Sequence, residues 1–275
     1  MAPEAVGSSP IIRPNKNTSP CVGLFYGPDN QTRPHHSPTK IFCYSEHMYK
    51  PFRSLQVFVD RYPMLGPAIW MLVVQYLVVQ VIAASFWKPP YSWRFNTISD
   101  LGNTACGAFG NRLVCSPLHV SMNISFIALG VLMISGSLLI YHEFHKNIGT
   151  FVGFSLMALG GVGTVLVGVF PENTSSGMHS LGAALALLVG NLSLVVLSIA
   201  LYKVSIGMRL YTGISGGVAL VAFSLFVSHH YWWLGIGGVE RFISYPQALW
   251  LIAFGVYMSH DRFCSSWTYL KKLVS

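Results

Sequence analysis

The chain has 275 residues, of which 52% are hydrophobic and only 9% are charged, whereas soluble domains carry charge on about a quarter of their residues. This composition excludes a soluble multidomain protein and predicts one integral membrane domain. The formal net charge of +8 is not arranged as a basic, aromatic-rich groove, so it indicates orientation in a membrane and not nucleic-acid binding.

The first 62 residues contain Pro, Ser, Asn, Thr and scattered charges without apolar periodicity. Because such a segment buries little apolar surface, we expect residues 1–62 to form a disordered cytoplasmic tail. No charged stretch is followed at once by an apolar core, so no cleavable signal peptide is predicted. We expect the transmembrane domain over residues 63–262 and a short basic cytoplasmic tail over residues 263–275.

Six apolar segments follow the tail, and none of them has an acidic or basic residue at mid-depth. Each is close to the roughly 20 residues that a helix needs to cross hydrocarbon. The apolar runs are continuous and not alternating, which favours helices over the strands of a barrel. The predicted fold class is therefore all-α, an integral membrane bundle with six transmembrane helices at about 65–87, 117–141, 148–170, 178–202, 210–230 and 241–260.

The distribution of Lys and Arg predicts the orientation of this bundle. Thirteen of the 17 Lys and Arg residues lie in the two terminal tails or in the loops that share their side of the membrane. Positive charge stays inside, so both termini should be cytoplasmic. We therefore expect a multi-pass protein of the plasma membrane whose first, third and fifth loops face the extracytoplasmic side.

The outer side gathers most of the residues that could carry chemistry, beginning with FNTISDLGNTACG at 95–107. Asp100 in this stretch could accept a proton, bind a cation or pair with Arg241, or it could simply complete a turn, since Ser-Asp before Leu-Gly-Asn is good turn chemistry. His179 lies on a helix face of small residues and should point into the bundle. It could act as a base, a proton shuttle or a ligand, or it could only bond a carbonyl or water.

Arg241 begins the sixth helix, where a cation is poorly placed beside the positive helix end. A buried carboxylate partner would offset that cost, and the candidates are Asp100, Glu172 and the adjacent Glu240.

Two cysteines, Cys106 and Cys115, lie in the same outer loop. Because an extracytoplasmic compartment permits disulfides, we expect these two cysteines to be bonded.

Two familiar kinds of site are not favoured. Asp100, His179 and either His229 or His230 offer zinc-binding atoms, but they lack the tight spacing of a metal motif, so we expect neither a metal nor another cofactor. A Ser–His–Asp triad is not favoured either, because Ser99 is adjacent to Asp100 and no GxSxG elbow is present.

Three motifs in register resemble the membrane family called Domain of Unknown Function 998. They are ISDLGN at 98–103, FPE followed by a helix-borne His at 170–179, and GVER at 238–241. The resemblance covers about residues 65–260 and implies the six-helix fold and a motif set, without a reaction. The matching positions are Ser99, Asp100, Gly102, Glu172, His179, Glu240 and Arg241. ISDLG alone also resembles the more distant Frag1/DRAM group.

Two functions are compatible with this outer polar cluster. In the first, it binds or processes an outer-leaflet lipid or small amphiphile, with Asp100 and His179 as acid and base. Substrate would be bound by Ser99, Asn103, Glu172, Glu240 and Arg241. In the second, the protein is a non-enzymatic carrier or a membrane partner subunit, and the cluster is a structural clasp. Membrane lipids are the expected partners, nucleic acid is not, and no oligomeric state is predicted.

Overall fold

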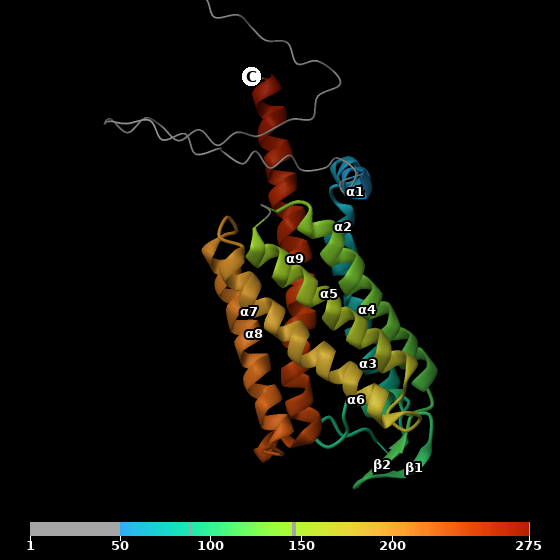
Figure 1. Ribbon diagram of the computed structural model, residues 1–275. Coiled ribbons are helices and arrows are strands. Elements are labelled where there is room, and N and C mark those ends of the chain that lie inside the picture. The colour runs from blue at the N-terminus through green and yellow to red at the C-terminus, as the bar shows by residue number, and fades with distance from the viewer. Residues whose placement is uncertain (1–49, 89, 145–146, 275) are drawn as a thin grey trace, which may run out of the picture. The chain divides into compact units, whose positions relative to one another are not determined.

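A computed structural model of the chain describes residues 50–88, 90–144 and 147–274 (Figure 1). Most of these residues are helical. The α-helices are α1 (Lys50–Arg61), α2 (Leu65–Met71), α3 (Val74–Ser85), α4 (His119–Tyr141), α5 (Ile148–Val169), α6 (Ser176–Ala184), α7 (Gly190–Ala200), α8 (Ile206–Val227) and α9 (Gly235–Val274). Shorter elements are the 3-10 helices η2 (Ser99–Gly102) and η4 (Trp232–Leu234), the π-helix η3 (Leu185–Val189) and the strands β1 (Cys106–Phe109) and β2 (Arg112–Cys115).

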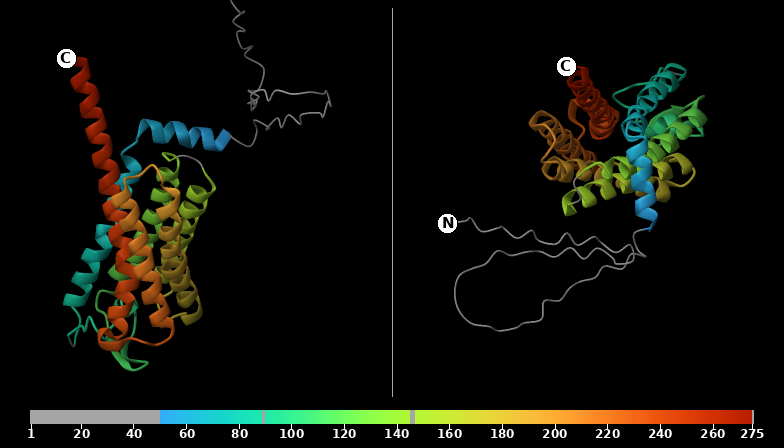
Figure 2. Two further views of the ribbon diagram at one scale, coloured as in Figure 1. Left: turned by 90° about the vertical axis from the view of Figure 1, so that its left-hand side faces the viewer. Right: turned by 90° about the horizontal axis from the view of Figure 1, so that it is seen from above.

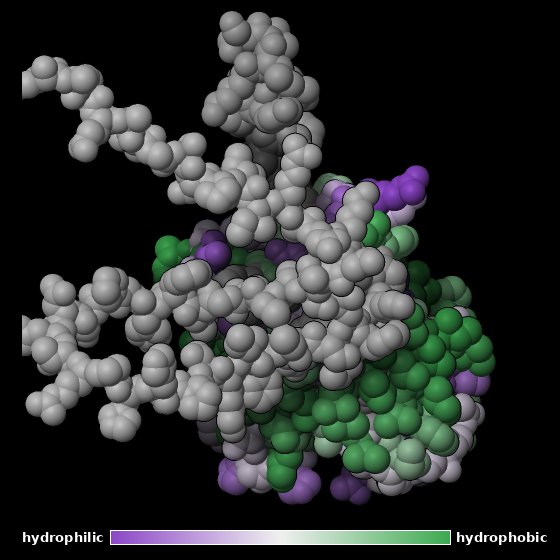
Figure 3. All heavy atoms as spheres, turned by 45° about the horizontal axis from the view of Figure 1, so that its top comes forward, coloured by the Kyte–Doolittle hydropathy of each residue, from purple (hydrophilic) through white to green (hydrophobic). Residues whose placement is uncertain are grey.

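Within the described residues, five helical segments are long and apolar enough to cross a membrane, namely α2 with α3, α4, α5, α6 through α7, and α8. Their bounds match the first five predicted segments within a few residues, which supports an integral, multi-pass membrane protein. Their outward faces are apolar. On α4, for example, Val120, Ile124, Val131 and Leu138 recur at helical spacing and are more than half exposed. Figure 3 shows apolar surface of this kind on the flank of the bundle.

Helix α9 covers the sixth predicted segment, although it is not among these five. Polar side chains near its start, such as Ser244 and Gln247, lower its hydropathy. The helix nevertheless continues without interruption through Pro246. Where it lies within the bundle, α9 packs against α2 and α8 (Figure 2).

The path of α9 is fixed by contacts at both ends of the bundle. At its start, the Gly237 N–H donates to the carbonyl of Arg94. Farther along, a Cβ on Gly255 would lie 2.7 Å from the Pro67 carbonyl oxygen, near the beginning of α2. Eighteen residues of helix rise about 27 Å, which is close to the thickness of a hydrocarbon core.

Close packing at the centre depends on small residues, as predicted. A Cβ on Gly163 would lie 2.5 Å from the Gly182 carbonyl oxygen, and one on Gly160 would lie 2.8 Å from the Cα of Gly190. Helix α5 therefore touches the backbone of α6 and α7, which is the way small residues bring membrane helices together.

The fourth span contains the π-helix η3, a feature that periodicity did not predict. Next to it, Asn191 Nδ2 donates to the carbonyls of Leu187 at 2.7 Å and Ile243 at 3.1 Å. The amide thus ties α7 to α9 beside an irregular turn. Such π-helical turns often accompany functional sites.

The first loop departs from an all-helical fold. Strands β1 and β2 form an antiparallel hairpin in which Phe109 pairs with Arg112, and Gly110 in the turn has a φ of 56°. The predicted disulfide between Cys106 and Cys115 is present at the open end of the hairpin.

The segment predicted to be a disordered tail, residues 1–62, contains the helix α1 at residues 50–61. Residues 1–49 of that tail lie outside the described residues.

Candidate functional site

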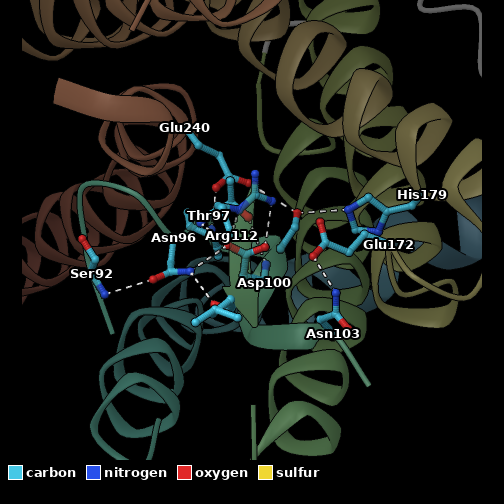
Figure 4. Close-up of polar contacts among 12 residues, drawn as sticks. Ser92, Asn96, Thr97, Asp100, Asn103, Arg112, Glu172, His179 and Glu240 are labelled. Atoms are coloured by element: carbon cyan, nitrogen blue, oxygen red, sulfur yellow. Dashed lines mark hydrogen bonds and ion pairs between the residues drawn. The ribbon is translucent and has the colours of Figure 1, made fainter. Parts of the chain in front are cut away.

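Three segments that are far apart in sequence meet at one end of the bundle: the loop before α4, the turn between α5 and α6, and the start of α9. Ile98 N–H donates to Glu240, Ser99 contacts His179, and Asn103 contacts Glu172. Figure 4 shows these side chains directed toward one another. The predicted site residues are therefore gathered in one place.

Asp100 is held by the turn in which it lies. Its carboxylate accepts the Thr97 N–H at 2.8 Å, while Thr97 Oγ1 accepts the Asp100 N–H at 3.0 Å. This reciprocal pair is the arrangement of a capping box, here starting η2. Asn96 Nδ2 adds a bond of 3.3 Å to the same carboxylate.

The cation that pairs with Asp100 is Arg112 and not Arg241. Arg112 donates from Nε and Nη2 at 2.9 and 2.8 Å, and the Asp100 side chain is fully buried. Burial alone raises the pKa of the Asp100 carboxyl, but the hydrogen bonds and charge of Arg112 outweigh it and bring the pKa below its usual value. Asp100 is therefore a carboxylate at neutral pH, positioned by two elements of the first loop.

Arg241 uses backbone carbonyls in place of the expected carboxylate. Its Nη1 donates to Trp93, Asn96 and Gly237, at distances between 2.7 and 3.1 Å, and its Nη2 donates to the Tyr91 hydroxyl. The guanidinium also lies 4.7 Å from the centre of the Trp93 ring. Because α9 begins at Gly235, Arg241 lies in its second turn and not at the helix start that the sequence predicted. Its acceptors therefore stabilise a buried cation, and the charge of the helix end has little part in this.

Ser99 Oγ lies within hydrogen-bonding distance of two alternative acceptors for its single proton. Its Oγ is 3.0 Å from His179 Nε2 and 3.3 Å from Glu240 Oε1. His179 Nδ1 is 2.9 Å from the carbonyl oxygen of Phe170. A carbonyl can only accept, so Nδ1 carries the proton of the neutral ring and Nε2 is the acceptor that faces Ser99.

Glu172 stands beside the Asp100 carboxylate and has a different protonation state. Asn103 Nδ2 donates to it at 2.9 Å. Burial, together with the negative charge of Asp100, raises the pKa of Glu172 to about 8. Two neighbouring carboxyl groups with opposite shifts are typical of sites that distinguish an acid from a base.

A narrow cavity of about 50 Å³ leads from Ser99 and Glu240 into the bundle. Its other walls are mainly apolar and come from several helices, with Phe126, Leu129, Met133, Val167, Ala186 and Leu251 among them. Ser99 is half-buried, whereas His179 is buried. The serine hydroxyl therefore stands at the wall of an apolar space.

Other predicted candidates lie apart from this centre. His229 and His230 are exposed, and His229 Nδ1 is 2.8 Å from the Tyr231 hydroxyl. Within the described ranges, no group of three or more His, Cys, Asp or Glu side chains could hold a metal ion. The sequence did not assign Arg112, Tyr91 or Thr97 to the site, although a Thr three residues before an Asp is a recognisable capping signal.

The sequence was compared with family models, curated proteins and solved structures. The chain matches none of the curated proteins and none of the solved structures with which it was compared. The family model described as protein of unknown function (DUF998) matches residues 68–257. This range holds the ISDLGN, FPE and GVER motifs, whereas the similarity to the Frag1/DRAM group stays a prediction. Since the match covers more than half of the chain and all of the gathered polar residues, the protein belongs to the DUF998 family.

Proposed function

We propose that this protein cleaves or transfers an acyl ester of a membrane lipid, with Ser99 as nucleophile and His179 as general base. The observation that carries the proposal is the 3.0 Å contact between Ser99 Oγ and His179 Nε2, while Nδ1 of the same ring bonds the Phe170 carbonyl at 2.9 Å. Covalent hydrolases share this arrangement of a nucleophile, a base and a third group that orients the base.

The proposed reaction needs only the lipid ester and an acceptor. Ser99 Oγ attacks the ester carbonyl carbon and gives its proton to His179 Nε2. The ester C–O bond breaks, and the leaving alcohol takes that proton. Water then attacks the acyl-serine through the same base and releases a carboxylic acid, or a second alcohol attacks and completes an acyl transfer.

The apolar walls of the cavity favour an acyl group over a polar substrate at Ser99. Ser99 stands at one end of a space whose walls include Phe126, Met133 and Leu251. A cavity of about 50 Å³ has room for only a short part of an acyl chain next to the ester, so the rest of the chain would remain in the membrane.

The remaining predicted site residues have supporting roles in this proposal. Asp100 is paired with Arg112, so it fixes the turn that carries Ser99 and is not the acid. Glu240 accepts from Ile98 N–H and lies 3.3 Å from Ser99 Oγ, so it sets the position of the nucleophile. Asn103, Glu172 and Arg241 hold the loop to its neighbours and restrict how substrate approaches.

We further propose six spans, with both termini in the cytoplasm and the site at the extracytoplasmic boundary of the plasma membrane. The length of α9 between its two anchoring contacts supports a sixth span. The excess of Lys and Arg on the side of the termini supports the orientation. The bonded Cys106 and Cys115, on the same loop as Ser99, are in keeping with an oxidising compartment.

An active-site probe tests the reaction. The full chain, purified in mild detergent, should be labelled by a lipid-like fluorophosphonate and should release fatty acid from a phospholipid ester. S99A should abolish labelling, and H179Q should slow it by about a hundredfold or more. S92A is the matched control, because Ser92 lies in the same loop and its Oγ accepts from Phe95 N–H. Folded wild-type protein that resists the probe, or S99A that reacts like wild type, would refute the proposal.

The density of the network favours a second candidate, a non-enzymatic carrier or partner subunit in which the cluster is a clasp. Arg241 binds three backbone carbonyls, and Thr104 and Asn173 exchange two further bonds between the loops. On this reading, S99A and H179Q would lower thermal stability by several degrees. No probe labelling would occur. Sidedness can be tested independently by labelling a cysteine introduced at Thr104 with a membrane-impermeant reagent.

A further inference from the structure

We infer that a groove between α8 and α9 binds an anionic phospholipid at a site separate from Ser99. The groove has a volume of about 730 Å³, within the range of pockets that hold small ligands. It lies on another side of α9 from the narrow cavity. Glu240 and Ser244 line the cavity, whereas their neighbours Arg241 and Tyr245 line the groove.

The charge at one end of the groove is complementary to a phosphate. Arg94 and Arg241 both line it, and none of its lining residues among those described is acidic. Arg94 is exposed. Arg241 is firmly positioned by its carbonyl partners, yet its Nε is buried without a hydrogen-bond partner. The groove therefore offers one fixed and one accessible cation.

Aromatic residues at the same end of the groove indicate that this end lies at the depth of the lipid head groups. Trp93, Trp233 and Tyr245 line the groove, and Trp233 is 74% exposed. Trp and Tyr are enriched where membrane meets water, because their rings are apolar and their polar atoms remain hydrated. The two arginines therefore lie where a lipid phosphate would lie.

The rest of the groove is an apolar channel along the helices. Ile214 and Val218 on α8 face Phe242 and Leu249 on α9. From Phe242 to Leu249 the helix rises about 10 Å over seven steps, enough for several methylene groups of an acyl chain. A cationic end at the boundary followed by an apolar channel matches a phospholipid and does not match a soluble anion.

A neighbouring groove on α8 provides a contrast. It is lined by Gly217, Val221, Leu225 and other apolar residues, with no charged side chain. Any lipid chain could cover it without regard to head group. Selection for an anionic head group is therefore expected at the arginine-bearing groove.

Native mass spectrometry of the full chain in mild detergent can test this site. Phosphatidylglycerol and phosphatidylcholine with identical acyl chains are titrated in separate samples. We expect phosphatidylglycerol to bind more tightly, and R94Q to weaken its binding about fivefold with little effect on phosphatidylcholine. K88Q is the matched control, because Lys88 is exposed but does not line the groove.

A second pair of variants tests the channel. L249W should fill the groove and weaken both lipids, because Leu249 lines this groove and not its neighbour. L138W makes the same replacement on the exposed face of α4 and should change neither. Equal binding of the two lipids by wild type would overturn the proposal. So would identical behaviour of R94Q and K88Q, or of L249W and L138W, in samples that remain monodisperse.

Discussion

Replacing Arg112 by Gln should destabilise the protein by about 3–5 kcal/mol, because it leaves a buried carboxylate without its cation. The Asp100 side chain has no exposed surface, and Arg112 supplies two of its bonds, at 2.9 and 2.8 Å. The Thr97 N–H would remain, at 2.8 Å, but one backbone donor does not replace a guanidinium. Asp100→Asn should cost less, about 1–3 kcal/mol, since the Arg112 side chain is 20% exposed and can be hydrated.

Thermal melting of the purified full chain in detergent measures both effects, and R112Q should lower Tm by roughly 10 °C. The double variant R112Q/D100N provides the decisive comparison. It leaves no unpaired charge at position 100, so it should melt above R112Q alone. If the double variant instead loses the sum of the two single losses, or if R112Q melts within a degree of wild type, the buried ion pair does not stabilise the loop as we describe.

Three further predictions concern neighbouring features. Because the folded-state pKa of Glu172 is about 8 against 4.5 ordinarily, stability should fall as pH rises through this interval, and melting curves of E172Q should lose that pH dependence, worth about 1–2 kcal/mol. Alkylation with and without reductant should show Cys106 and Cys115 modified only after reduction, and C106S should cost about 2 kcal/mol by thermal melting. Gly237→Ala would press a Cβ against the Asn96 carbonyl, so it should lower Tm by several degrees, and an unchanged Tm would contradict this packing.

The sequence predicted the helices because the property that defines them is local. A stretch of about 20 apolar residues is suited to hydrocarbon whatever its neighbours are. The predicted face of small residues on the helix that carries His179 is confirmed by the close approach of Gly160 to Gly190. The disulfide was predictable as well, since both cysteines lie in one short loop.

The gathering of Asp100, His179, Glu240 and Arg241 at one end of the bundle was also implied by the order of the spans. Residues that flank successive membrane helices on the same side must lie at similar depth. Depth alone, however, does not determine which of them are in contact, because several donors and acceptors of the right type are present at that level.

Individual pairings were decided by tertiary structure. A hairpin returns Arg112 to Asp100, and although Gly110-Asn111 is a recognisable hairpin turn, the sequence does not show where its strands will lie. Arg241 binds carbonyls of a loop almost 150 residues away in sequence, which no side-chain pattern encodes. Likewise, Ser99 meets His179 only because η2 and the start of α6 are packed together. Hydropathy and charge balance act on each segment separately and are readable from sequence, whereas a hydrogen bond requires two groups to be placed within about 3 Å, and only the packed bundle fixes that distance.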